Sequence, residues 1–137
     1  DLLEFVVRMH GIDFVNDSKA TNLNSAWYAL ETMDTPVIWI AGGIDKGNDY
    51  SKLIELVSQK VKAIICLGID NSKIIETFGD KVGAIYETQS MEQAVMTAYT
   101  IGKKDDTVLL SPACASFDLF ENYEERGNMF KKEVKKL

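Results

Sequence analysis

The stretch PVIWIAGGIDKGNDYSKLIELVSQKVKAIICLG, residues 36–68, decides the fold class. One strand-like run, VIWIA, is continuously apolar, and the other, VKAIICLG, is apolar except for Lys62. Both are expected to be buried strands, since a continuously apolar run suits a strand that is covered on both faces. Between them, SKLIELVSQK has apolar residues at the spacing of an amphipathic helix. A strand, a helix and a second strand in this order predict a parallel βαβ unit.

The same alternation continues through the rest of the chain. Further strands are expected in VGAIYET and DTVLLSPA, and further helices in LNSAWYALETM, NSKIIETFG, SMEQAVMTAYTIG and residues 116–137. Upstream, LEFVVRMH and IDFV flank Gly11 and predict two short strands joined by a tight turn. The expected fold is one α/β domain over residues 1–137. It is Rossmann-like and doubly wound, with a mostly parallel sheet of about six strands, an N-terminal antiparallel edge strand and helices on both faces.

The composition restricts the partners and the compartment. The net charge of −6 argues against a nucleic-acid partner or an anionic membrane surface. No run of roughly twenty apolar residues occurs, so no transmembrane helix is expected. Cys66 and Cys114 lie in no CxxC motif, which predicts free thiols in a reducing compartment. We therefore expect a cytoplasmic protein, and a monomer.

Several common catalytic sites are disfavoured by the sequence. His10 is the only histidine, and we interpret it as an ordinary residue at a strand end. Neither a GxxxxGK[ST] phosphate-binding loop nor a GxGxxG fingerprint occurs, so a redox dinucleotide-binding domain is disfavoured. No metal site is expected in this chain.

The chemistry is expected in the loops that follow the strands, because ligands of open α/β sheets bind at the carboxyl ends of strands. Of five such loops, GIDNS and ETQS look like short capped turns. NDSKATN (16–22), GGIDKGND (42–49) and SPACASFD (111–118) are longer and rich in functional groups. These three loops should meet at one end of the molecule.

Each of the three loops also has a simpler interpretation. Lys46 suits an anion, but a lysine in a solvated turn is equally compatible with the sequence. Ser116 stands where the N-cap of the last helix is expected, and a helix N-terminus binds carboxylate or phosphate readily. Cys114 has no histidine placed to activate it, so a nucleophilic role is disfavoured.

The first loop has more polar side chains than helix capping requires. Capping uses one such residue, whereas Asp17, Ser18, Lys19 and Thr21 follow one another closely. Lysines, hydroxyls and a helix N-terminus together suit a small ligand with more than one negative charge, such as a dicarboxylate or a phosphate.

The same loops carry a family resemblance. NDSKATN, GGIDKG and LSPACASFDLFENYEERG together resemble the C-terminal domain of the Mur ligases, in the right order and over essentially the whole chain. DSKATN and the SPACAS segment favour the family member that adds D-glutamate to UDP-N-acetylmuramoyl-L-alanine. They favour it over relatives that add other residues and over folylpolyglutamate synthase.

The resemblance implies an ATP-dependent amide-forming ligase of peptidoglycan precursor synthesis, and so of cell-wall biogenesis, cell shape and cell division. Such ligases have three domains. The first holds the UDP-sugar substrate and the central one carries the P-loop and the Mg²⁺ ligands. The last, which this chain resembles, brings the amino acid. ATP phosphorylates the substrate carboxylate, and the amine of D-glutamate attacks the acyl phosphate. This chain alone is then expected to be inactive.

The resemblance also implies roles for individual residues. Thr21 and Lys46 should hold one carboxylate of D-glutamate, and Ser116, with the backbone near Phe117 and Tyr123, should hold the other.

On the nucleotide side, Asp17 should face the ribose or adenine of ATP, with Asn22 also on that side. Lys19 should lie beside the phosphates and the amino acid, as the catalytic residue of this domain. The chain departs from the family at Leu2, where an arginine that contacts the nucleotide is often found, and at Tyr123, where some relatives have Phe.

An alternative remains open on the residues alone. A stand-alone, non-catalytic binding module for a small anionic ligand would show the same three loops.

Overall fold

The computed structural model describes residues 3–34 and 36–137. Leu2, the position where the resemblance places an arginine, lies outside the described residues. The helices and strands, in chain order, are β1 (Glu4–Met9), β2 (Ile12–Asn16), α1 (Leu23–Glu31), β3 (Val37–Ala41), η1 (Tyr50–Leu53), α2 (Ile54–Lys60), β4 (Val61–Leu67), α3 (Ser72–Phe78), β5 (Ala84–Thr88), α4 (Met91–Ile101), β6 (Thr107–Leu110) and α5 (Tyr123–Lys135).

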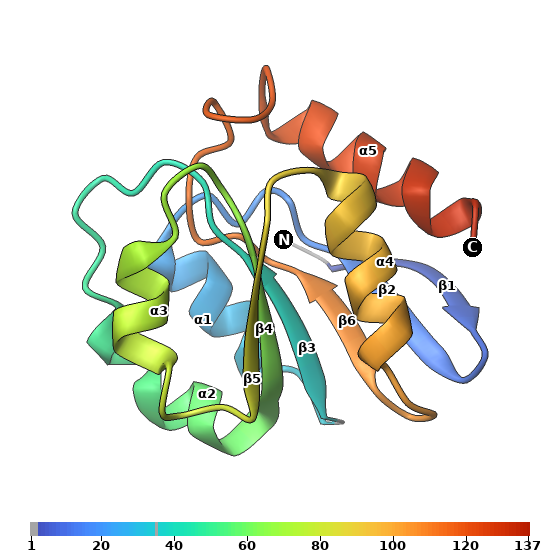
Figure 1. The fold of residues 1–137 in the computed structure, drawn as a ribbon, viewed down its shortest axis with the longest axis horizontal. Helices are drawn as coiled ribbons and strands as arrows, with labels where there is room; N and C mark the ends of the chain where they lie inside the picture. Colours follow the sequence, from blue (N-terminus) through green and yellow to red (C-terminus); the bar gives the residue numbers. More distant parts are fainter. Residues whose placement is uncertain (1–2, 35) are drawn as a thin grey trace.

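In the described part of the chain, six strands form one sheet in the order β1-β2-β6-β3-β4-β5. The pairs from β2 to β5 are parallel, and β1 pairs antiparallel with β2 at the edge. Figure 1 shows the helices covering both faces, with α1, α2 and α3 on one and α4 and α5 on the other. The expected fold class is confirmed, including the antiparallel edge strand.

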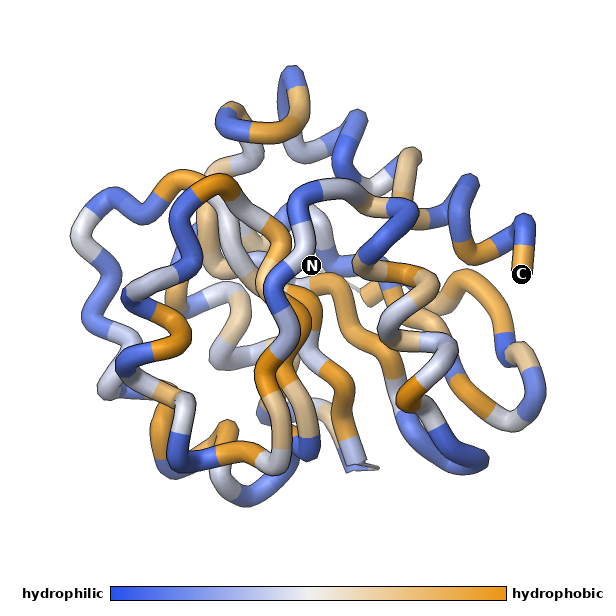
Figure 2. Tube along the Cα trace, viewed as in Figure 1, coloured by the Kyte–Doolittle hydropathy of each residue, from blue (hydrophilic) through white to orange (hydrophobic). Residues whose placement is uncertain are grey.

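The core explains why the central strands are apolar throughout. In β3, Trp39 packs in the cluster beneath α1–α3, whereas its neighbours Ile38 and Ile40 pack in the cluster beneath α4 and α5. All three side chains are fully buried, since a strand covered on both faces has no solvent side. In Figure 2 the central strands are largely orange, with bluer helical surfaces outside them. The Trp39 indole N–H donates to the Ser111 carbonyl at 2.7 Å, which satisfies its buried polar atom.

The last helix begins later than the sequence predicts. Its N-cap is Asn122, whose side chain accepts from the Glu125 N–H, so the expectation of a helix from Ser116 is wrong. The Ser116 carbonyl accepts from the N–H groups of Leu119 and Phe120, which forms a single turn that does not continue. Residues 116–122 form a loop that leads into α5, and Phe120 within this loop is buried.

Candidate functional site at the carboxyl ends of β3 and β6

Adjacent strands β3 and β6 send the chain to opposite sides of the sheet. After β3 the chain continues toward β4, and after β6 it continues to α5, which contacts β1 and β2. This is the topological switch point of the sheet, where open α/β folds form a ligand-binding crevice. The loops 42–49 and 111–122 leave from it, and the loop 17–22 follows the neighbouring strand β2. The three loops therefore meet at one end, as the sequence predicts.

The loop after β6 is held against the loop after β3 by backbone contacts. The Gly42 N–H donates to the Pro112 carbonyl at 3.0 Å, and the Ile44 N–H donates to the Ala115 carbonyl at 2.9 Å. Gly43 has φ of +140°, and a Cβ placed on it would lie 2.1 Å from the Ala115 carbonyl oxygen. Only glycine fits there, because both the backbone conformation and the space exclude a side chain.

The loop after β6 also contacts the loop after β2. The Ala113 N–H donates to the Ala20 carbonyl at 2.8 Å, and the Ser111 hydroxyl donates to the Asp17 carboxylate at 3.0 Å. The Ser18 hydroxyl donates to the Tyr123 carbonyl at 2.6 Å. The loop 111–122 thus forms the centre of the site, with the other two loops on either side of it.

Arg126 also connects the loop after β2 with the loop after β6. Its guanidinium is buried and donates to the Ser18 hydroxyl at 3.0 Å, the Ser18 carbonyl at 2.8 Å and the Cys114 carbonyl at 3.0 Å. Arg126 is not among the site residues predicted from the sequence. A signal was present, because Arg126, Phe130 and Val134 recur every four residues along a helical face whose other members are core residues.

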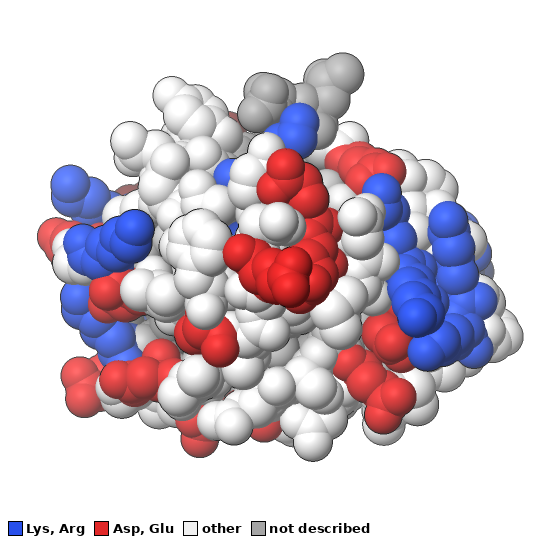
Figure 3. Space-filling view, turned by 90° about the horizontal axis from the view of Figure 1, so that it is seen from above, with Lys and Arg blue, Asp and Glu red and all other residues white. Residues whose placement is uncertain are grey.

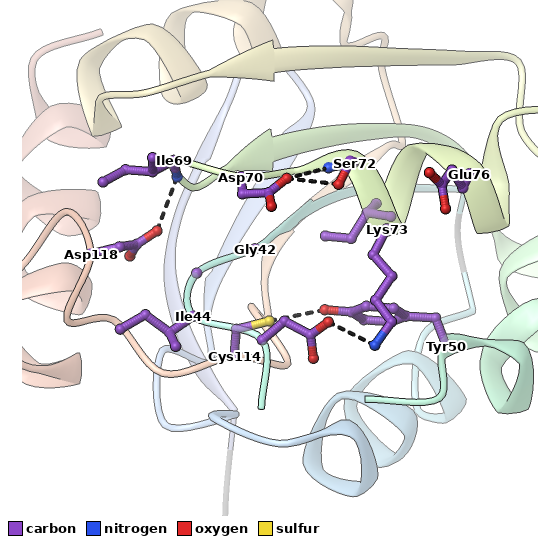
Figure 4. Close-up of a pocket in the computed structure, with 13 residues that line it drawn as sticks. Gly42, Ile44, Tyr50, Ile69, Asp70, Ser72, Lys73, Glu76, Cys114 and Asp118 are labelled. Atoms are coloured by element: carbon purple, nitrogen blue, oxygen red, sulfur yellow. Dashed lines mark hydrogen bonds and ion pairs between the residues drawn. The ribbon is translucent and has the colours of Figure 1, made fainter. Parts of the chain in front are cut away.

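A cavity of about 520 Å³ opens beside the loop after β3. Its lining comes from the loops after β3, β4 and β6 and from α3: Gly42, Gly43, Ile44, Asp45, Tyr50, Ile69, Asp70, Ser72, Lys73, Ile74, Glu76, Cys114 and Asp118. Lys73 reaches across the cavity (Figure 4), and its ammonium forms an ion pair with the Asp45 carboxylate at 2.9 Å. The loop GIDNS was interpreted as a short capped turn. Its Asp70 carboxylate accepts from the Ser72 N–H, although the N-cap of α3 is Asn71, which makes no side-chain cap hydrogen bond. The loop also contributes to this cavity, which the sequence did not predict.

Two smaller cavities flank the loop after β2. One, of about 200 Å³, is lined by Asp17, Lys19 and Tyr28 among others. The other, of about 330 Å³, is lined by Asp17, Lys19 and Tyr123 among others. Asp17 and Lys19 therefore stand between two hollows, in a position from which they can contact a ligand on either side.

The residues expected to bind the amino-acid substrate differ in solvent exposure. Thr21 is half-buried, Lys46 is exposed, and Ser116 is buried with an exposed fraction of 2%. Within residues 3–34 and 36–137, the Ser116 hydroxyl makes no hydrogen bond, so it is available to a ligand. Phe117 and Tyr123 have exposed side chains, which leaves their backbone as the part that could contact a ligand beside Ser116.

Asn22 has part of its side chain already engaged. Its Oδ1 accepts from the Ser25 N–H and caps α1. Only its amide N–H₂ is left for a nucleotide, so its expected role is restricted to donating hydrogen bonds.

Burial affects the ionisable groups of the site. Burial raises the pKa of the Asp17 carboxyl, and the hydrogen bond from Ser111 and the charge of Lys19 only partly oppose this effect. Burial likewise raises the pKa of the Cys114 thiol, whose sulfur lies 3.0 Å from the Tyr50 hydroxyl. A thiol held protonated is a poor nucleophile, which agrees with the prediction that Cys114 has no nucleophilic role.

Two features are absent from the described residues, 3–34 and 36–137. No group of three or more His, Cys, Asp or Glu side chains there is placed to hold a metal ion. None of the helices there has the length and apolar character needed to cross a membrane.

Sequence comparison identifies the family. Residues 3–114 match the family described as Mur ligase, glutamate ligase domain. The chain belongs to the Mur ligase family. Among curated relatives, it is 57% identical to the UDP-N-acetylmuramoylalanine–D-glutamate ligase of Christiangramia forsetii and 58% identical to that of Porphyromonas gingivalis. Each match covers 98% of this chain but only 30% of the relative, so this Mur ligase domain spans about a third of their length.

Solved structures share the fold of this Mur ligase domain at low identity. A crystallised domain from Haemophilus ducreyi, described as part of a UDP-N-acetylmuramate:L-alanyl-gamma-D-glutamyl-meso-diaminopimelate ligase, superposes with a TM-score of 0.66. The match covers 98% of both chains, with 11% sequence identity. At that identity the likeness shows the fold alone.

Proposed function

We propose that this chain is the amino-acid-binding domain of an ATP-dependent ligase that joins D-glutamate to UDP-N-acetylmuramoyl-L-alanine. The observation that carries the proposal is its 57–58% identity, over 98% of its length, to ligases of that name. The reaction runs through an acyl phosphate, and this domain contributes positioning and charge rather than a covalent intermediate. The longer protein would be a cytoplasmic monomer of peptidoglycan precursor synthesis.

On this proposal the crevice binds the amino acid across its loops. Thr21 and Lys46, from the loops after β2 and β3, bind one carboxylate. Ser116 and the backbone at Phe117 and Tyr123 bind the other. The exposure of Lys46 and the free hydroxyl of Ser116 support this assignment, because both groups can still take a ligand.

The nucleotide contacts fall on the other side of the loop after β2. Asp17 and the Asn22 amide face the ribose or adenine of ATP, and Lys19 lies beside the phosphates. Their support is the pair of hollows on either side of Asp17 and Lys19. The Mg²⁺ that accompanies ATP is assigned to the remainder of the longer protein, as the family resemblance of the loops implies.

The test is a reaction with the full-length protein. It is incubated with UDP-N-acetylmuramoyl-L-alanine, ATP, Mg²⁺ and D-glutamate, and the products are followed by mass spectrometry and phosphate release. We expect one new amide product, heavier by one glutamate residue, and one phosphate per amide. L-glutamate serves as the stereochemical control and should give little product. Amide formation with another amino acid, but not with D-glutamate, would overturn the substrate assignment.

The rival function is a stand-alone module that binds a small anion without catalysis. The same reaction separates the two, because a module would bind D-glutamate without forming amide or phosphate.

A further inference from the structure

Arg126 occupies an electrostatically costly position. It lies in the first turn of α5, and its exposed fraction is 1%. Burial lowers the pKa of its guanidinium to about 10, so the group is still charged at neutral pH. A buried charge is expensive unless a partner charge and hydrogen bonds compensate it.

The compensation is incomplete. Within the described residues, 3–34 and 36–137, Arg126 has no ion pair with a carboxylate. Asp118 acts on it electrostatically, but the Asp118 oxygens accept hydrogen bonds from the N–H groups of Ile69 and Leu119. The first turn of a helix is also the positive end of its dipole, which disfavours a cation there.

The hydrogen bonds of Arg126 all go to the loops that form the crevice. Two go to Ser18, directly before Lys19, and one goes to Cys114, two residues before Ser116. The C=O and N–H of one trans peptide point in opposite directions. Fixing the carbonyls of Ser18 and Cys114 therefore also fixes the direction of the Lys19 and Ala115 N–H groups.

On the three crevice loops, the exposed cations are Lys19 and Lys46. Figure 3 looks down on this end of the molecule and shows acidic side chains gathered near its middle, with Lys and Arg toward the sides. Glu124 and Glu125 lie in the first turn of α5, where Glu124 is exposed and Glu125 is half-buried. An anionic substrate that approaches this end therefore depends on the cations inside the crevice.

We propose that Arg126 is a positioning residue for the acidic amino acid. It holds the loops 17–22 and 111–122 at the separation that the substrate requires, and its unbalanced charge makes the floor of the crevice attractive to a carboxylate. This inference rests on the proposed function. It adds a buried residue, without substrate contact of its own, to the groups that determine affinity for D-glutamate.

A purely structural clamp would also use these hydrogen bonds, and kinetics distinguish the two roles. Loss of a structural clamp lowers the melting temperature and the folded fraction, which reduces apparent kcat but leaves the KM of the folded molecules unchanged. Loss of a positioning residue raises the KM for D-glutamate in molecules that are folded.

The experiment uses the full-length ligase with Arg126→Lys and Arg126→Met. Lysine keeps the charge but loses the planar fork that reaches both loops, and methionine loses both. We expect the KM for D-glutamate to rise by about tenfold for Arg126→Lys and further for Arg126→Met, with a smaller change in kcat. Arg8→Met, at an exposed arginine of the β1–β2 hairpin, is the control and should leave KM unchanged.

Ser18→Ala is a second, milder variant that tests the inference if Arg126→Met does not fold. It removes one acceptor of the guanidinium, together with the donor to the Tyr123 carbonyl, and leaves the charge of Arg126 and its bonds to the Ser18 and Cys114 carbonyls in place, so a smaller rise in KM is expected. A KM within twofold of wild type in Arg126→Lys and Ser18→Ala, with only a lower melting temperature, would overturn the inference and leave the proposed function standing. A wild-type enzyme that makes no amide from D-glutamate would overturn both.

Discussion

At the scale of single residues, the site contains ionisable groups whose burial conflicts with their charge. Asp17 is the clearest case, since burial raises its pKa although it lies next to Lys19. A carboxyl whose pKa is higher in the folded state stabilises the fold below its unfolded pKa, about 3.9. That contribution is lost as the pH rises through the folded pKa. At neutral pH, the ionised Asp17 therefore costs stability.

Asp17→Asn should raise the melting temperature at pH 7, because it removes a partly buried charge and keeps a group that can bond to Ser111. The gain should disappear at pH values below about 3.9, where Asp17 is protonated in both states. Asp49→Asn is the control with opposite sign, since hydrogen bonds from Ser51 lower the pKa of Asp49. Thermal unfolding at several pH values measures both. A lower melting temperature for Asp17→Asn at pH 7 would contradict this account.

Lys46 gives a second prediction at this scale. Lys46→Ala in the full-length ligase should raise the KM for D-glutamate, because a charge-assisted hydrogen bond to a carboxylate contributes about 1.5–3 kcal/mol. That corresponds to about tenfold or more in KM. Lys52→Ala removes another exposed lysine nearby in the chain and should have no such effect. An unchanged KM for Lys46→Ala would return Lys46 to a solvated turn residue.

At the scale of elements, the order of strands and helices could be predicted, but one boundary could not. Apolar runs such as VIWIA indicate strands buried on both faces, and β3 is buried throughout. Phe117, Phe120 and Tyr123 are spaced three residues apart, and this near-helical spacing predicts a helix from Ser116. Phe120 is buried, but Phe117 is 64% exposed, so the spacing did not reflect a continuous buried face.

Because α5 begins after Asn122, helix capping and ligand binding are assigned to different residues, Asn122 and Ser116. Asn122→Ala removes the N-cap of α5 and should lower the free energy of unfolding by about 0.5–2 kcal/mol. Ser116→Ala should cost less stability, because Ser116 caps no helix, and should raise the KM for D-glutamate instead. Denaturant unfolding and steady-state kinetics on the full-length ligase give the two readouts. Equal destabilisation by both substitutions would assign Ser116 a structural role.

At the scale of the whole molecule, the sequence indicated the end of the sheet where the site lies but not how its loops are joined. The position of β6 between β2 and β3 brings the loops 17–22 and 111–122 together. Arg126 donates hydrogen bonds to both loops, and its bond to Ser18 spans 108 positions in the chain. Local periodicity carries no information about such pairs. For the same reason, the contribution of the loop after β4 to the cavity was missed.

The division of the reaction between this domain and the rest of a longer ligase gives the last prediction. The chain spans about a third of its curated relatives and has no P-loop motif, so residues 1–137 supplied with all three substrates should release no ADP above a protein-free control. The full-length ligase, assayed in parallel, shows that the substrates are competent.

The crevice loops are already tied together by hydrogen bonds within this domain, so NMR titration of the isolated chain with D-glutamate should shift signals of Thr21, Lys46 and Ser116 first. ADP release by the isolated chain would contradict this division. Shifts confined to the acidic cavity around Lys73 would place the amino acid there and not among these three residues.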